Sequence, residues 1–227
     1  EAIGTECSEL DLSGGSPLPK YADLIEQGGK RLLETLEGVL TLSKLEAGQM
    51  ELSAETVDLS DQARRAVEEL RAKAEEKGVG LELKTRPAAT AGPEVTAEAD
   101  EGGVQIVLRN LLSNAIKYTD EGTVRVRTYR ENGQENGRAA ATEVTAAVLE
   151  VEDTGIGMDP EAAEGLFEPF RQASEGWSRE YEGTGIGLAV TREAVEQMGG
   201  TIEVDTEEGE GTRVTVRLPL AGQAEAA

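Results

Sequence analysis

The sequence predicts an α+β fold, in which a mixed or antiparallel sheet carries helices on one face and a helical arm precedes it. Two observations support this class. From about residue 55 onward, helix-like and strand-like stretches are mixed without a regular βαβ rhythm, and helices on one face of a sheet are the simplest layered solution for such a mixture. The 227 residues are 38% apolar but only 3% aromatic, so the core must consist mostly of Val, Leu, Ile and Ala.

The arm is predicted to be helical over residues 19–45, with Pro19 in its first turn and a helix remnant and a polar loop before it. Apolar residues recur along it at spacings of seven, four and three, which is a seam of coiled-coil type. Such a stripe needs a partner, either the rest of this chain or a second copy. We favour a helical hairpin that dimerises into a bundle, because the seam lies outside the compact part that follows. The seam consists of Ile25, Leu32, Leu33, Leu36, Val39 and Leu40.

The compact part begins after an extended stretch, with Asp58 or Ser60 as the candidate cap of its first helix and Gly78 as its end. The expected helices are 61–77, 100–118 and 185–198, and the expected strands are 79–84, 123–130, 143–152, 201–206 and 212–218. The stretch "ENGQENGRAAAT" (131–142) is expected to be a turn-rich loop, and 85–99 a loop with a possible short strand. The expected units are a partial hairpin at 1–48, a linker at 49–60, a domain at 61–220 and a tail at 221–227.

Charge and composition exclude several functions. The net charge is −23, and a field of that sign repels DNA and anionic membranes, so we expect no nucleic-acid partner and no membrane contact. The single cysteine, Cys7, fits a reducing compartment and hence the cytoplasm. The chain has no histidine, which excludes a histidine triad, a histidine metal site and a histidine phosphoacceptor within it.

The basic residues are mostly arginine, because only seven of the 22 are Lys. We hypothesise that the protein works in a salt-rich cytoplasm, where salt screens the repulsion among its carboxylates. The alternative is an ordinary acidic protein. Loss of folding in high KCl, with full stability in dilute buffer, would refute the salt hypothesis.

The helix over 100–118 carries a polar stripe. Asn110, Asn114, Lys117 and Tyr118 fall at i, i+4, i+7 and i+8, on one face. A solvated helix face is the ordinary explanation, but Asn is a weak helix former. Two Asn one turn apart can offer oxygens to Mg²⁺, which shares its ligand shell with phosphates. Lys117 can then meet a phosphate, and Tyr118 can stack on a base.

The tetrapeptide TGIG occurs twice, at 154–157 and 184–187. In the first copy, Asp153 ends an apolar strand before Gly155 and Gly157. An Asp there can be an ordinary turn residue. Its carboxylate can instead accept from the exocyclic amine of adenine, while the glycines let the backbone approach the ring.

The second copy supplies Thr184, Gly185, Gly187 and Leu188 at a predicted helix N-terminus, where free N–H groups favour phosphate. It is neither a Rossmann nor a Walker motif, since the spacing is G-x-G-x-G and no Gly-Lys-Ser/Thr occurs. Residues 166–183 between the copies are expected to form a mobile lid, with Phe167 and Phe170 anchoring one end. Thr212 is expected to close the fold near the first turn. The two turns are thus expected to bracket one nucleotide, with the base at the first and the phosphates at the second.

Four stretches in this order resemble the ATP-binding domain of sensor histidine kinases. "NLLSNAIKYT" resembles the N box, "DTGIGM" the first glycine box, "LFEPFRQ" the phenylalanine box and "GTGIGLAV" the second glycine box. "LSKLEAGQMEL" (42–52) resembles the junction between the dimerisation hairpin and the catalytic domain of these kinases, and "EGTRVTVRLPL" their closing strand. The resemblance covers about 19–220. It implies the Bergerat-type α/β sandwich shared with gyrase and a heat-shock chaperone.

The resemblance also implies roles for single residues. Asn114 matches the Mg²⁺ ligand, Asn110 a position near the metal and the γ-phosphate, and Lys117 the lysine that contacts phosphate. Tyr118 matches the aromatic beside the base, and Asp153 the adenine-reading aspartate. The glycine boxes match at Gly155, Gly157, Gly185, Gly187 and Leu188, and Arg171 would reach the phosphates from the lid base.

The implied function is transfer of the ATP γ-phosphate to a histidine on the dimerisation helix, for relay to a response-regulator aspartate. The implied partners are a second copy, a receiver domain and an upstream sensor domain. No residue here matches the acceptor histidine, so we expect it upstream in a longer parent protein, whether or not that parent is anchored in a membrane. The alternative is a kinase homologue that lacks the acceptor. This chain is then expected to bind ATP without autophosphorylating. The alternative is an ATP-dependent conformational or dimerisation module without phosphotransfer.

Overall fold

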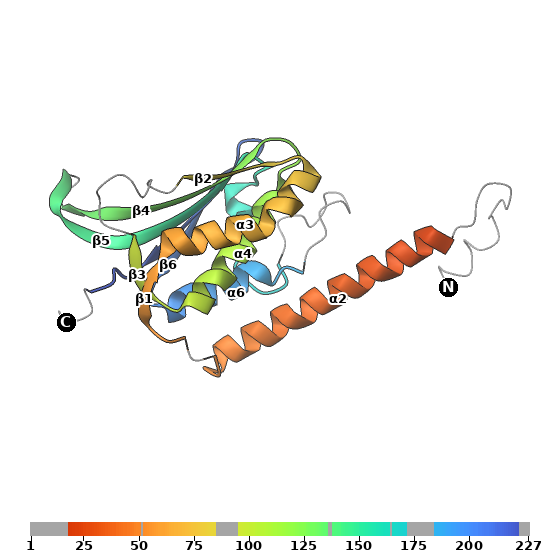
Figure 1. Ribbon diagram of the computed structural model, residues 1–227, viewed down its shortest axis with the longest axis horizontal. Helices are drawn as coiled ribbons and strands as arrows, with labels where there is room; N and C mark the ends of the chain where they lie inside the picture. The colour runs from red at the N-terminus through yellow and green to blue at the C-terminus, as the bar shows by residue number, and fades with distance from the viewer. Residues whose placement is uncertain are drawn as a thin grey trace.

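The structure, a computed structural model, describes residues 18–50, 52–84, 95–135, 138–163, 165–171 and 184–222. A long helix, α2 (Leu18–Glu46), extends from a layered domain of sheet and helices, as Figure 1 shows. The predicted polar loop before this helix and most of the predicted lid lie outside the described residues. The predicted α+β class, with a mixed sheet and a helical arm before it, is confirmed.

The main sheet has five strands in the order β2-β4-β5-β7-β6. Strand β2 pairs parallel with β4 and the other neighbours pair antiparallel, so the sheet is mixed. Its strands are β2 (Gly80–Lys84), β4 (Thr123–Glu135), β5 (Arg138–Asp153), β6 (Thr201–Glu207) and β7 (Gly211–Leu218). A separate antiparallel pair joins β1 (Glu55–Asp58) to β3 (Thr96–Ala99).

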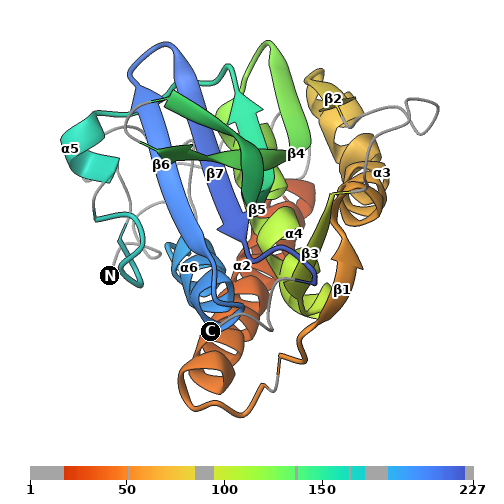
Figure 2. The same ribbon diagram turned by 90° about the vertical axis from the view of Figure 1, so that its left-hand side faces the viewer.

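Three helices cover one face of the main sheet (Figures 1 and 2). They are α3 (Leu59–Lys77), α4 (Glu101–Tyr118) and α6 (Gly187–Gln197), while the short α5 (Pro160–Ala163) follows β5. Leu108 and Leu112 of α4 are fully buried, in the same apolar cluster as Val124 and Val126 of the sheet. Each such side chain contributes about 1.5–3 kcal/mol on leaving water, so this apolar layer fixes α4 beneath the sheet.

The caps of the helices follow the local sequence. Asp58, one of the two candidate caps of α3, accepts hydrogen bonds from the backbone N–H groups of Ser60 and Asp61. Gly78 ends α3 in the left-handed conformation, with φ of 77°. Asp100 caps α4 by accepting from the Gly103 N–H. These caps confirm that α3 and α4 begin and end close to the predicted positions.

The hairpin of β4 and β5 is longer than predicted. The stretch 131–142 was expected to be a turn-rich loop, but both strands continue into it, with Glu135 paired to Arg138. Two register shifts, around Asn132, accommodate the irregular residues. Cross-strand pairing outweighs the turn preference of Asn and Gly here, since strand propensity depends strongly on context. Residues 136–137 at the tip lie outside the described residues.

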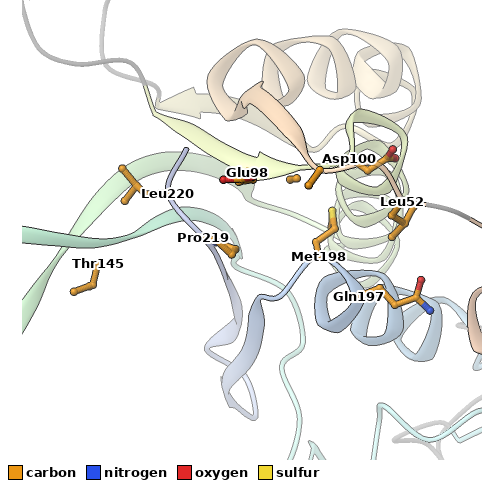
Figure 3. Close-up of a pocket in the computed structure, with 10 residues that line it drawn as sticks. Leu52, Glu98, Asp100, Thr145, Gln197, Met198, Pro219 and Leu220 are labelled. Atoms are coloured by element: carbon orange, nitrogen blue, oxygen red, sulfur yellow. The ribbon is translucent and has the colours of Figure 1, made fainter. Parts of the chain in front are cut away.

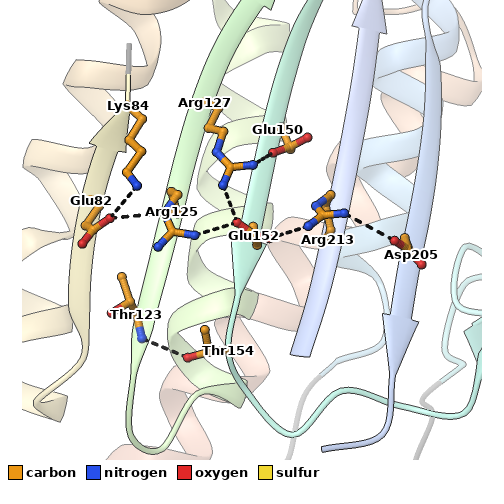
Figure 4. Close-up of polar contacts among 10 residues, drawn as sticks. All are labelled: Glu82, Lys84, Thr123, Arg125, Arg127, Glu150, Glu152, Thr154, Asp205 and Arg213. Atoms are coloured by element: carbon orange, nitrogen blue, oxygen red, sulfur yellow. Dashed lines mark hydrogen bonds and ion pairs between the residues drawn. The ribbon is translucent and has the colours of Figure 1, made fainter. Parts of the chain in front are cut away.

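The outer face of the sheet carries an ionic network (Figure 4). Glu152 of β5 accepts from three arginines, at 2.8 Å from Arg125, 2.9 Å from Arg127 and 2.5 Å from Arg213. The alternation of valine and arginine in β4 therefore places Val124 and Val126 in the core and the arginines among carboxylates. One face of the sheet is held by apolar packing and the other by paired charges.

The arm, α2, is partnered along only part of its length. Leu45 is fully buried, and its carbonyl accepts a hydrogen bond of 2.7 Å from the Gln197 side chain of α6. The predicted seam is exposed in the single chain, with Ile25 76% and Leu32 72% accessible. In the part of the chain that the structure describes, no helix has both the length and the apolar character needed to cross a membrane.

Candidate nucleotide site

The predicted site residues converge at one end of the layers. There β5 ends and β7 begins, with Asp153 paired to Thr212. The backbone N–H of Ile156, in the first glycine turn, donates to the Tyr118 carbonyl at the end of α4. Asn110 of α4 donates to the Gly187 carbonyl at the start of α6. The structure therefore brings the polar stripe of α4, the first glycine turn and the second glycine turn together.

Asp153 is a buried carboxylate, and no described residue places a cation beside it. It is 9% exposed, and its Oδ1 accepts a hydrogen bond of 2.9 Å from the Gly155 N–H. Burial raises the pKa of this carboxyl, while the Gly155 and Thr212 N–H groups pull it back down in part. A carboxyl held in this way is suited to accept from a ligand donor that reaches it.

The glycines of the first turn are required by contacts within the chain. A Cβ on Gly155 would lie 2.3 Å from the Tyr118 carbonyl oxygen. A Cβ on Gly157, where φ is 57°, would lie 1.9 Å from the Glu207 carbonyl oxygen. The expected reason for these glycines was close approach of the backbone to a ring. The structure shows another reason, which is close approach of this turn to the end of α4 and to the β6–β7 hairpin.

The stripe on α4 divides into engaged and open side chains. The Asn110 amide donates to the Gly187 carbonyl at 3.1 Å and to the Thr191 hydroxyl at 3.3 Å, so it holds α6. The Lys117 ammonium lies 4.5 Å from the Tyr118 ring centroid and donates to the Tyr118 hydroxyl at 3.0 Å. Asn114 is half-buried, and its carboxamide has no hydrogen-bond partner among the residues that the structure describes.

The second glycine turn leads into α6. Gly185 takes φ of 68°, its carbonyl accepts from the Phe170 N–H at 2.9 Å, and the Thr184 hydroxyl accepts from the Ile186 N–H at 3.3 Å. No side chain among the described residues caps α6, whose N-cap is Ile186. The first N–H groups of Gly187 and Leu188 thus belong to an uncapped helix start, where the positive end of the helix dipole favours an anion.

The described base of the predicted lid differs from expectation in part. Phe167 is half-buried beneath the Arg192 guanidinium, 5.5 Å from its ring centroid. Phe170 was expected to anchor the lid, but its side chain is 65% exposed and its backbone has φ of 67°. Arg171 was expected to reach toward phosphates, and here its guanidinium pairs with Glu168 at 3.0 Å. The Phe170 N–H donates to the Gly185 carbonyl, so the backbone of Phe170, and not its ring, is held at the base of the lid.

Sequence reasoning missed three residues that support the site. The Thr206 hydroxyl of β6 accepts from the Met158 N–H at 3.1 Å and so ties the first glycine turn to the hairpin. The Thr191 hydroxyl accepts a hydrogen bond from the Asn110 amide, which also donates to the Gly187 carbonyl. The Lys77 ammonium at the end of α3 donates to the Ile116 carbonyl of α4 at 3.0 Å. Threonines in strands and lysines at helix ends are too common for their residue types alone to indicate these contacts.

A cavity of about 330 Å³ lies at the opposite end of the layers (Figure 3). It is bordered by the other ends of the same elements, including Asp100 at the start of α4, Met198 after α6 and Pro219 after β7. None of its described lining residues belongs to the predicted nucleotide site. Asp100 and Glu98 give it an acidic rim, which disfavours a phosphate there.

Comparison with known proteins shows which family the chain resembles. The family described as "Histidine kinase-, DNA gyrase B-, and HSP90-like ATPase" matches residues 99–222. The circadian input-output histidine kinase CikA of Synechocystis sp. is 35% identical over 196 residues, which are 86% of this chain and 24% of that protein. The histidine protein kinase DivJ of Caulobacter vibrioides is 33% identical over 201 residues, which are 88% of this chain and 31% of that protein.

A solved structure gives the same result. The crystal structure of full-length ShkA in complex with AMPPNP has a TM-score of 0.67 and 28% identity, over 90% of this chain and 39% of that one. The chain spans about a quarter of the length of the Synechocystis kinase. The chain belongs to the histidine kinase-, DNA gyrase B- and HSP90-like ATPase family, and it carries an ATP-binding domain of the sensor histidine kinase type.

Proposed function

We propose that this chain is the catalytic part of a sensor histidine kinase, which binds ATP with Mg²⁺ and transfers the γ-phosphoryl group to a histidine on a dimerisation helix. One observation carries the proposal. The buried Asp153 carboxyl, the Asn114–Lys117–Tyr118 stripe and the uncapped start of α6 meet at one end of the layers. This set offers an acceptor for a base, a cation and N–H donors for phosphates, and an amide oxygen for a metal.

The base would lie against Asp153 and Tyr118. The Asp153 carboxyl accepts from the exocyclic amine of adenine, and Tyr118 contacts the ring. The Lys117 ammonium donates to the Tyr118 hydroxyl at 3.0 Å. Binding of ATP therefore requires the Lys117 ammonium to exchange the Tyr118 hydroxyl for a phosphate oxygen.

The phosphates would lie between Lys117 and the start of α6. Asn114 fits the role of Mg²⁺ ligand, since its half-buried carboxamide is not engaged by another described residue. The metal would neutralise charge on the phosphates when bound. Asn110 positions α6 against α4, and Thr184, Gly185, Gly187 and Leu188 form the turn whose N–H groups face the anion. Transfer of a phosphoryl group asks for positioning and charge stabilisation, which these residues can supply.

The acceptor and the partners lie outside this sequence, which contains no histidine. The proposed acceptor is on a dimerisation helix, and the phosphoryl group would pass on to a response-regulator aspartate. The exposed seam of α2 supports a homodimer, because a second copy would cover Ile25 and Leu32. An upstream sensor domain and a cytoplasmic location complete the proposal.

The test is an ATP titration in concentrated KCl, with and without Mg²⁺. We expect saturable binding that Asp153→Asn weakens by roughly tenfold, because a buried donor on the base loses its acceptor. Asn114→Ala should reduce the effect of Mg²⁺ and leave metal-free ADP binding unchanged. The wild-type chain should then phosphorylate a histidine-bearing hairpin supplied in trans. Binding without transfer would favour an ATP-dependent conformational module, and no binding by a folded chain would overturn both.

A further inference from the structure

The end of α4 is held by groups from three other parts of the chain. The last four carbonyls of any helix lack partners within it. In α4, the Ala115 carbonyl accepts from the Thr119 hydroxyl at 2.8 Å, and the Tyr118 carbonyl accepts from the Ile156 N–H at 3.1 Å. The two carbonyls between them, of Ile116 and Lys117, both accept from the ammonium of Lys77.

Lys77 acts as a clamp between the ends of α3 and α4. It is the last residue of α3, directly before the left-handed Gly78. Two residues beyond Gly78, the Gly80 N–H donates to the Gly122 carbonyl at 2.9 Å. Its ammonium also pairs with Asp120 at 3.3 Å, and its side chain is 32% exposed. A cation at this point offsets the negative end of the α4 dipole. The ends of α3 and α4 are therefore joined through one side chain.

Lys117, one of the two residues whose carbonyls Lys77 holds, is also proposed to contact the nucleotide. Lys117 carries the ammonium proposed for the phosphates, and Tyr118, the next residue, carries both the ring and the carbonyl that holds the first glycine turn. A shift of this last turn of α4 would move the phosphate-binding cation, the aromatic and the Asp153 turn together. Small displacements of this kind matter, because binding and transfer depend on geometry.

We propose that Lys77 is a positioning residue of the nucleotide site, which acts through the carbonyls of Ile116 and Lys117 without touching ATP. This inference rests on the proposed ATP-binding function. Lys73 is a matched control, because it lies one turn earlier on α3 and also reaches α4, where it donates to the Ser113 hydroxyl at 3.1 Å and not to the helix end.

The experiment compares Lys77→Met, Lys77→Arg and Lys73→Met with the wild type in ATP and adenosine titrations, at a temperature where all are folded by circular dichroism. We expect Lys77→Met to weaken ATP binding by about tenfold, because two carbonyls lose a charged donor, and adenosine binding by less. Lys77→Arg should recover most of the affinity, and Lys73→Met should stay close to wild type.

Equal ATP affinity in Lys77→Met and Lys73→Met would overturn the inference while leaving the proposed function intact. Equal losses in Lys77→Met and Lys77→Arg would overturn it as well, since a guanidinium can also donate to two carbonyls. Absence of ATP binding by the wild type would instead refute the proposed function.

Discussion

Two neighbouring carboxylates, Glu152 and Asp153, face opposite sides of the sheet and are held in opposite ways. Glu152, on the outer face, is surrounded by Arg125, Arg127 and Arg213 (Figure 4). Hydrogen bonding to Arg213 and Arg125 lowers its pKa. Asp153, on the inner side, accepts from the backbone N–H groups of Gly155 and Thr212, and burial raises its pKa.

The difference separates a structural carboxylate from one available to a ligand. A carboxylate that is already neutralised by arginines has little to gain from another donor. A buried carboxylate without a countercharge is destabilised by desolvation in the free protein. A ligand that donates a hydrogen bond to it offsets part of this free-energy cost. We therefore expect changes at Glu152 to affect stability and changes at Asp153 to affect binding.

The largest effect should come from removing the turn that positions Asp153. Gly157→Ala would place a Cβ 1.9 Å from the Glu207 carbonyl oxygen at a φ of 57°. The backbone must shift, and we expect a loss of about 2–4 kcal/mol in the free energy of unfolding, from strain and overpacking together. Urea denaturation measures this loss.

Gly209→Ala is the control for the Gly157 variant. Gly209 also has a positive φ, of 83°, but a Cβ there would meet no atom within 4 Å. Backbone strain alone should then cost about 1 kcal/mol. If the two variants lose the same stability, the close contact between the first glycine turn and the hairpin does not matter.

The next effect concerns Asp153 itself. Asp153→Asn should weaken ATP binding by about 1–3 kcal/mol while changing the free energy of unfolding much less. The raised pKa of Asp153 sets the sign of the pH dependence of stability. A carboxyl whose pKa is higher in the folded state stabilises the fold at low pH and loses that contribution as pH rises through its folded pKa. The wild type should therefore gain stability relative to the variant on acidification.

Calorimetric ATP titrations and urea denaturation of both proteins, from acidic to neutral pH, check this prediction. A variant that binds ATP as tightly as wild type would remove Asp153 from the site. A variant that unfolds more readily at neutral pH, by as much as it loses in binding, would make Asp153 a structural residue like Glu152.

Local signals account for the features that could be predicted from the sequence. Asp58 and Gly78 bound α3 as their residue types indicate, and the alternation around Val124 places arginines on the outer face. The candidate site residues could be proposed from the sequence because their motifs are short and local. Their individual contacts with ATP remain predictions, although the structure brings these residues to one end of the layers.

The features that could not be predicted depend on contacts between distant segments. The contact of Gly157 with Glu207 spans 50 residues, and the Lys77 clamp on α4 spans 39. The hairpin beyond Glu131 forms because the partner strand is present, against the turn preference of its own Asn and Gly residues. The prediction that Phe170 anchors the lid was wrong, because its ring is exposed while its backbone N–H donates to the Gly185 carbonyl. None of these has a signature within one window of the sequence.

The smallest effect should come from Glu152. Glu152→Gln keeps one acceptor but removes the charge shared by three arginines, and its side chain is only 18% exposed. We expect a loss of about 1 kcal/mol in the free energy of unfolding near neutral pH, after allowing for solvent screening, and unchanged ATP affinity. The pKa of Glu152 is lowered in the folded state. Glu152 therefore stabilises the fold at pH values above its unfolded pKa, and this stabilisation is lost as pH falls through its folded pKa.

The difference between wild type and Glu152→Gln should thus shrink on acidification, which is opposite in sign to the behaviour of Asp153. Glu203→Gln is the matched control, since Glu203 pairs with Arg217 on the same face but is 68% exposed. The free energy of unfolding lost by Glu203→Gln should be at most about half of that lost by Glu152→Gln, as for exposed ion pairs in general. If Glu152→Gln changes ATP affinity and leaves stability unaltered, the two faces of the sheet do not divide their roles, and the charge of Glu152 acts across the sheet on the site.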